Sequence, residues 1–102
     1  MSRIIVRSPR TEADLEEILD YLGRQSAQLA YRFLRMAETT FAFLAKSSDP
    51  GSPFDGAEPR LANLRYWPIK RFPNHLVFFR TTETELQIVR VLHGARNLEA
   101  IL

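Results

Sequence analysis

Apolar residues recur along the first half of the chain with the spacing of two amphipathic helices. The first stripe follows the i, i+3, i+4, i+7 pattern at Leu15, Ile18, Leu19 and Leu22. A second stripe continues through Ala30, Phe33, Leu34, Ala37, Phe41 and Leu44. Ser8 followed by Pro9 is a helix-start signal, with Thr11 as an alternative cap. Gly23 is expected to end the first helix, and Ser26 can cap the second, so the pattern predicts a helical hairpin.

Strand patterns flank this hairpin on both sides. Arg3 to Arg7 holds three β-branched residues in a row, which is typical of a short strand. After a Gly- and Pro-rich loop over 49–59, the chain predicts strands at 64–72, 75–81 and 86–93, with turns at Pro73-Asn74 and at 82–85, and a short helix within 95–102. Pro68 has no amide proton for a central strand, so the strand that holds it should be an edge strand or bulged there.

The order of these elements predicts an α+β fold, β-α-α-β-β-β, over a single domain of residues 1–102. Each helix and strand has one apolar face to bury. We therefore expect the helical hairpin to pack on one face of a curved, mainly antiparallel sheet. The other sheet face is expected to be left for something else.

Composition narrows the class of protein. The chain has 45% hydrophobic and 25% charged residues, which is ordinary for a soluble globular protein. It has no cysteine, which excludes disulfides and thiolate metal sites. The apolar run near the start is three residues long, far short of a secretory or membrane segment. A cytoplasmic protein with no membrane contact is expected.

Basic residues are concentrated in the second half of the chain. Residues 1–59 carry a net charge of −2, whereas residues 60–102 carry +4. The predicted sheet gathers a cationic and aromatic cluster: Arg60, Arg65, Trp67, Lys70, Arg71, His75, Arg80, Arg90, His93 and Arg96. Such a cluster could grip phosphates, stack on bases or bind a protein partner. Arg90 lies in mid-strand between two valines, so it is expected either to pair internally or to face a functional surface.

The sequence has few residues or motifs that would indicate an enzyme or a bound cofactor. His75 and His93 are the only histidines, and neither is one helical turn from a second metal ligand. No phosphate-binding glycine loop and no GxSxG nucleophile motif is present, so no cofactor is expected. His93 stands at a strand end, where a histidine is more often a structural hydrogen bonder than a base. Gly94 beside it permits a turn, which would form a rigid corner with Arg96.

The order of several fragments along the whole chain resembles the ParE branch of the RelE/ParE toxin superfamily. The fragments are Asp14-Leu15-x-x-Ile18-x-x-Tyr21-Leu22, Ala30-x-x-Phe33, Leu64-Arg65-x-x-Pro68-Ile69, His75-Leu76-Val77-Phe78-Phe79-Arg80 and Ile88-Val89-Arg90-Val91-Leu92-His93-Gly94-Ala95-Arg96. The closing His-Gly-x-Arg segment is the sharpest of them.

The resemblance implies the toxin of a type II toxin-antitoxin system, neutralised by a cognate protein antitoxin in a hetero-oligomer. The ParE branch is associated with inhibition of DNA gyrase, which implies a toxin that acts on its target without being an enzyme. Antitoxins of this class wrap an extended segment over the toxin, and an acidic amphipathic segment would suit a basic, partly apolar surface. The expected contact residues for target or antitoxin are Arg65, Trp67, Arg71, Arg80, Arg90, His93 and Arg96.

Two alternatives remain open at the level of sequence. The RelE branch cleaves messenger RNA on the ribosome, and Arg65, Arg90 and His93 could then supply the cations and the proton relay. Against it, no tyrosine follows Tyr66, and the two lysines form no basic run. The other alternative is a non-toxic interaction domain of the same fold.

Overall fold

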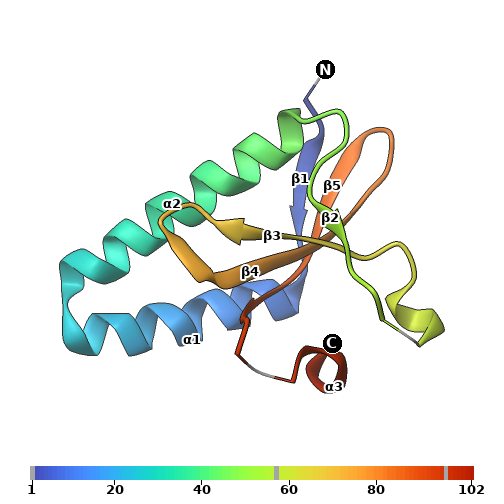
Figure 1. The fold of residues 1–102 in the computed structure, drawn as a ribbon. Helices are drawn as coiled ribbons and strands as arrows, with labels where there is room; N and C mark the ends of the chain where they lie inside the picture. Colours follow the sequence, from blue (N-terminus) through green and yellow to red (C-terminus); the bar gives the residue numbers. More distant parts are fainter. Residues whose placement is uncertain (1, 57, 96) are drawn as a thin grey trace.

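The helical hairpin lies across one face of a five-stranded sheet in the computed structural model, which describes residues 2–56, 58–95 and 97–102 (Figure 1). The elements are β1 (Ile4–Arg7), α1 (Pro9–Gln25), α2 (Ala27–Lys46), β2 (Ser52–Pro53), the 3₁₀ turn η1 (Pro59–Leu61), β3 (Arg65–Ile69), β4 (Phe72–Thr81), β5 (Glu85–His93) and α3 (Leu98–Ile101). The predicted α+β order is confirmed. The short β2 is an addition, because it lies in the segment expected to be a loop.

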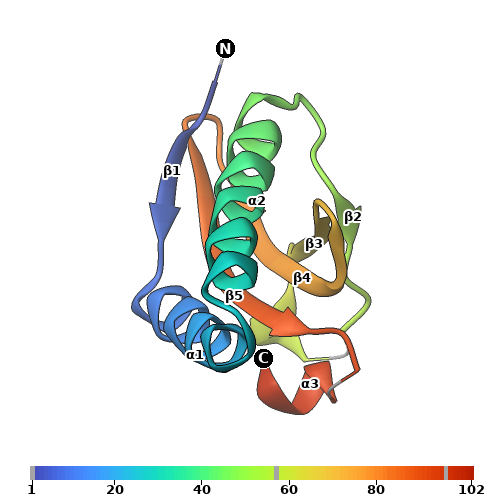
Figure 2. The same cartoon turned by 90° about the vertical axis from the view of Figure 1, so that its left-hand side faces the viewer.

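The strands are arranged in the order β1-β5-β4-β3-β2. β1 is parallel to β5, and all other neighbours are antiparallel, so β1 and β2 form opposite edges of the sheet (Figure 2). β2 pairs only with Arg65 and Tyr66 of β3. Pro68 therefore lies where β3 is an edge strand, and the register shifts between Pro68 and Ile69. The expectation of an edge position or a bulge at this proline is confirmed on both counts.

Serine side chains cap both long helices, as the sequence predicted. The Oγ atom of Ser8, rather than Thr11, caps α1 by accepting a backbone N–H at 3.0 Å. Ser26 caps α2. The expected end of α1 at Gly23 is wrong, because the helix continues to Gln25. Ser26, with φ of −165°, is the residue at which the chain leaves the helical conformation.

The turn between β3 and β4 lies earlier than the sequence predicted. Pro73 and Asn74 were expected to form it, but both belong to β4, and the chain turns at Lys70-Arg71. Arg71 adopts a left-handed conformation with φ of 66°. The backbone N–H of Lys70 donates to Thr40 Oγ1 at 3.0 Å, which fastens the turn to α2.

Each face of the sheet has its own apolar core. The larger core lies between the sheet and α1 and α2, and its largest buried side chains include Phe33, Phe41 and Phe79. The other face, which was expected to be left for something else, is covered by the chain itself, because a second cluster includes Phe78 and Leu92. Its covering side chains come from the segment before β3, from α3 and from the residue after α3: Phe54, Leu61, Leu64, Leu98, Ile101 and Leu102.

Candidate functional site

Where β1 ends, polar groups at the start of α1 form hydrogen bonds with the backbone at the edge of β5. Ser8 donates its backbone N–H to the carbonyl of Ile88 at 3.0 Å, and the Thr11 hydroxyl donates to the same oxygen at 3.1 Å. Asp14 Oδ2 accepts the backbone N–H of Val91 at 3.1 Å. Backbone and side-chain groups at the start of α1 therefore satisfy polar groups at the edge of β5 that a neighbouring strand would otherwise bond.

Arg90 is paired inside the protein. Its Nε donates to Asp14 Oδ2 at 2.7 Å and its Nη2 donates to Asp14 Oδ1 at 2.9 Å, which is a forked contact. Its Nη1 donates to the carbonyl of Ile101 in α3 at 3.2 Å. The side chains of Arg90 and Asp14 are only 11% and 9% exposed. The hydrogen bond to Asp14 raises the pKa of Arg90 above its ordinary value. Of the two expectations for this residue, internal pairing is the one found.

Arg65 and Arg80 also bond to the protein's own backbone. Arg65 Nε donates to the carbonyl of Pro50 at 2.6 Å, and its Nη2 donates to the carbonyl of Gly51 at 2.9 Å. Arg80 Nη2 donates to the carbonyl of Arg60 at 2.7 Å. Each guanidinium fastens a loop to the sheet, so much of its hydrogen-bonding capacity is already used.

The three residues expected to serve a ribonuclease are not brought together. Arg65 pairs in register with Phe79, whose ring lies in the core beneath the helices. Arg90 pairs with Phe78, whose ring lies in the cluster on the opposite sheet face. Because cross-strand partners share a face, the two guanidinium groups start from opposite sides of the sheet.

His93 faces solvent at the end of β5 and stands directly across from His75 on β4. The two ring centres are 5.1 Å apart. His93 Nδ1 accepts the backbone N–H of Ala95 at 3.1 Å, which agrees with the structural role expected of it. A hollow of about 440 Å³ beside the pair is also lined by Asp14, Glu17, Ile18, Tyr21, Val91 and Leu92. Arg96, the remaining member of the expected corner, lies outside the described residues.

His75 should make the stability of the protein depend on pH. Burial lowers its pKa below the ordinary value of 6.5, and the nearby His93 lowers it further. The unfolded chain then takes up the proton first as the pH falls. We therefore expect the free energy of unfolding to decrease as the pH is lowered through 6.5 toward the folded-state pKa. Denaturant unfolding between pH 7.5 and 5.5 measures this slope. His75→Phe should flatten it, and equal slopes in the two proteins would contradict the assignment.

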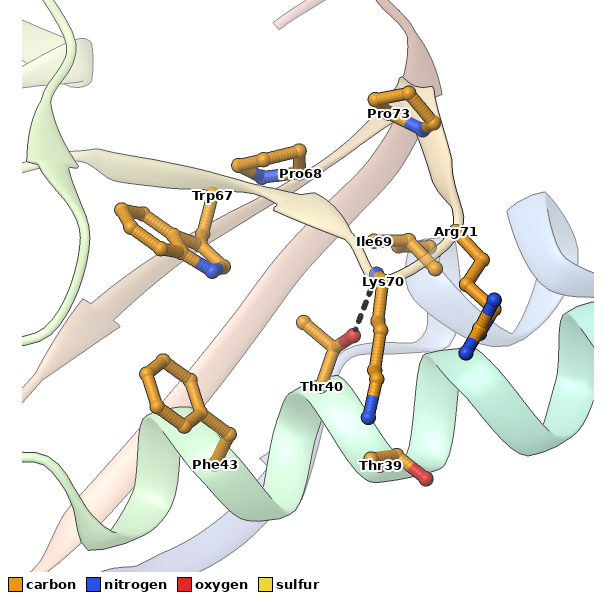
Figure 3. A pocket seen from close by; sticks show the side chains of 9 residues that line it. All are labelled: Thr39, Thr40, Phe43, Trp67, Pro68, Ile69, Lys70, Arg71 and Pro73. Carbon is orange, nitrogen blue, oxygen red and sulfur yellow. Dashed lines mark hydrogen bonds between the residues drawn. The ribbon is translucent and has the colours of Figure 1, made fainter.

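Trp67 and Arg71 are the two expected contact residues that share one groove. The groove lies between α2 and the β3–β4 hairpin and has a volume of about 550 Å³ (Figure 3). Its lining residues are Thr39, Thr40, Phe43, Trp67, Pro68, Ile69, Lys70, Arg71 and Pro73. We call it the Trp67 groove.

Sequence reasoning missed two residues that shape these surfaces. Asp14 was named only within a fragment that resembles the family, although it lies one turn before Ile18 on the apolar stripe. That position was a usable signal of burial. Phe43 lies beside the second stripe rather than on it, and its 55% exposure follows from that offset.

Within residues 2–56, 58–95 and 97–102, no three histidine, aspartate or glutamate side chains are grouped so that they could hold a metal ion. No helix in the described part of the chain is long and apolar enough to cross a membrane.

Comparisons with known proteins identify the family. Residues 5–98 match the family model described as ParE toxin of type II toxin-antitoxin system, parDE. A solved structure described as a chromosomal ParDE TA system from P. aeruginosa has the same fold, with a TM-score of 0.74 at 19% sequence identity. That similarity covers 90% of this chain and 96% of the other. No match is found among curated proteins. Because the family match spans nearly the whole sequence, the chain belongs to the ParE toxin family of type II toxin-antitoxin systems.

Proposed function

We propose that the protein inhibits DNA gyrase and is neutralised by a cognate protein antitoxin, as its family resemblance implies. The observation that favours this target over messenger RNA is the placement of the arginines. Cleavage of RNA by its 2′-hydroxyl needs cationic groups and a proton relay around one phosphate. Arg65 and Arg90 extend from opposite sheet faces and already donate to protein acceptors. A role without catalysis fits this arrangement.

Contact with the target is assigned to the exposed end of β5. His93 is exposed there. Arg96 follows it three residues later in the sequence, within the basic segment 60–102. Arg65, Arg80 and Arg90 are assigned to the internal support of the fold, because each bonds to the protein itself. Trp67 and Arg71 lie in a separate groove.

Purified protein incubated with DNA gyrase and plasmid is expected to accumulate cleaved DNA, and addition of the cognate antitoxin should abolish the effect. A parallel translation reaction tests for ribosome-dependent cleavage of messenger RNA. Unaltered gyrase activity together with messenger cleavage would replace the gyrase proposal by the RelE-like alternative. Absence of both effects, with normal growth on expression, would leave an interaction domain.

A further inference from the structure

The outer edge of β1 carries an apolar run that remains exposed. Ile4, Ile5 and Val6 are 67%, 38% and 41% exposed, and they are three of the six large apolar side chains that are exposed in the described part of the chain. β1 pairs only with β5, and Figure 2 shows it at the rim of the sheet with no described strand beyond it. An exposed apolar edge strand is a template for pairing with a strand of another chain.

The backbone groups along this edge are spaced for a further strand. The N–H of Ile4 donates to the carbonyl of Thr84 at 2.8 Å, and the N–H of Ser8 donates to the carbonyl of Ile88 at 3.0 Å. Successive residues of a strand direct their N–H and C=O groups to alternate sides, so those of Ile5 and Arg7 point away from β5. The outer edge therefore offers the hydrogen-bonding groups of two residues to another strand.

Charge is distributed unevenly between the two ends of β1. At its end, Arg7 lies 3.7 Å from a carboxylate oxygen of Glu12 and 3.7 Å from one of Glu38, so the negative charges there outnumber the positive. Before its start, Arg3 donates to two backbone carbonyls at 2.7 and 2.8 Å and forms no ion pair with a described residue. An antiparallel strand of the same sequence would bring its positive start to this negative end. The edge of β1 is therefore complementary to itself.

We propose that the protein forms a two-fold symmetric dimer in which β1 pairs antiparallel with β1 of a second copy. Ile5 would face Ile5 of the second copy across the symmetry axis and exchange two backbone hydrogen bonds with it. Ile4 would face Val6 of the second copy, so the apolar side chains meet one another. Arg3 would reach the carboxylates beside Arg7 of the second copy. A shift of two residues in either direction would place Ile5 opposite an arginine, so the apolar run selects this register.

The expected interface is small, because β1 has only four residues. Stable protein interfaces bury about 1,200–2,000 Å² in total, and a short edge strand supplies less than that. We therefore expect a weak dimer, with a dissociation constant on the order of 10–500 μM. No residue of β1 lines the Trp67 groove or the hollow beside His93. Dimer formation thus leaves both surfaces open and depends neither on the gyrase target nor on the antitoxin.

Sedimentation velocity of the purified full chain between about 5 and 500 μM is expected to show a monomer that converts to a dimer as the concentration rises. Ile4→Lys places a cation among the paired apolar side chains, and Glu12→Arg faces Arg3 of the second copy with a like charge. Each should raise the dissociation constant at least about tenfold. Asp20→Arg reverses an exposed charge two turns further along α1 and should stay within about twofold of the wild type. Circular dichroism checks that every variant is folded.

Cysteine cross-linking tests the register, because the chain has no cysteine of its own. An equal mixture of the Ile4→Cys and Val6→Cys proteins should form a mixed disulfide dimer under mild oxidation, since directly opposite residues lie about 4.5–5.5 Å apart. In either variant alone the two cysteines would be more than about 7 Å apart, so cross-linking should be at least about fivefold lower. Tyr31→Cys, at a position of similar exposure on α2, gives the background of random collisions.

A protein that stays monomeric up to about 500 μM overturns the proposal, as does a dimer that Ile4→Lys and Glu12→Arg leave unchanged. Equal cross-linking in the mixture and in the single cysteine variants would refute the register and the pairing of β1 with it. The other possible occupant of this edge is a strand of the antitoxin. A monomeric toxin whose folded Ile4→Lys variant binds the purified antitoxin about tenfold more weakly than the wild type would assign the edge to the antitoxin instead of a second copy.

Discussion

Replacement of Arg90 by alanine is expected to lower the free energy of unfolding by about 3–5 kcal/mol, because it leaves the carboxylate of Asp14 buried without its cation. The remaining partner of that carboxylate is the backbone N–H of Val91. Arg90→Lys should recover only part of the loss, since an ammonium group cannot reproduce the forked contact. Urea unfolding followed by circular dichroism measures each value.

Controls separate the buried pair from ordinary surface charge. Glu16→Gln removes an exposed acid from the same helix and should change stability by less than about 0.5 kcal/mol. The double variant Asp14→Leu with Arg90→Met removes both charges and should be more stable than Arg90→Ala alone. A stable, folded Arg90→Ala protein that has lost toxicity would instead show that Arg90 contacts the target.

Replacement of Gly51 by alanine is expected to cost about 2–5 kcal/mol, from a left-handed backbone and from overpacking. Gly51 has φ of 70°, and an added Cβ would lie 2.6 Å from Cζ of Phe79 and 2.8 Å from the carbonyl oxygen of Tyr66. Phe79 is fully buried in the larger core, so neither contact can relax easily. Thermal or urea unfolding of the variant measures the loss.

Gly23→Ala is the matched comparison, and it is expected to raise the stability that Gly51→Ala lowers. Gly23 lies within α1, and an added Cβ would meet only the Cβ of Ala30 at 3.9 Å. Alanine is the better helix former, so a gain of about 0.5–1 kcal/mol is expected. Equal effects of the two substitutions would contradict the account of Gly51.

Most of the fold could be predicted from the sequence, because the buried faces of long elements appear as periodic patterns of apolar residues. The apolar stripes of α1 and α2 and the apolar runs of β4 and β5 are patterns of this kind. The position of the β3–β4 turn has no such pattern. Pro73-Asn74 is a common turn pair, whereas the actual turn places Arg71 in a conformation that few arginines adopt. The cover on the second sheet face was missed for a similar reason. Its contributors, such as Phe54 and Leu61, belong to segments too short to show a period.

The candidate site was less predictable, because it depends on pairs of residues distant in sequence. Arg90 could be recognised as a charge in an apolar strand, but nothing in the sequence links it to Asp14, which lies 76 residues away in α1. The Trp67 groove likewise joins Phe43 on α2 to Trp67 on β3. Only the tertiary arrangement brings such residues together.

The parallel pairing of β1 with β5 has a consequence for synthesis of the toxin. Asp14 and Arg90 are 76 residues apart, and at about 5–20 residues per second the ribosome needs roughly 4–15 s to make the chain between them. During that interval β1 has no sheet to join, and the carboxylate of Asp14 must stay hydrated. A nascent chain that lacks β5 therefore cannot present the folded toxin surface, which can form only after β5 has been translated.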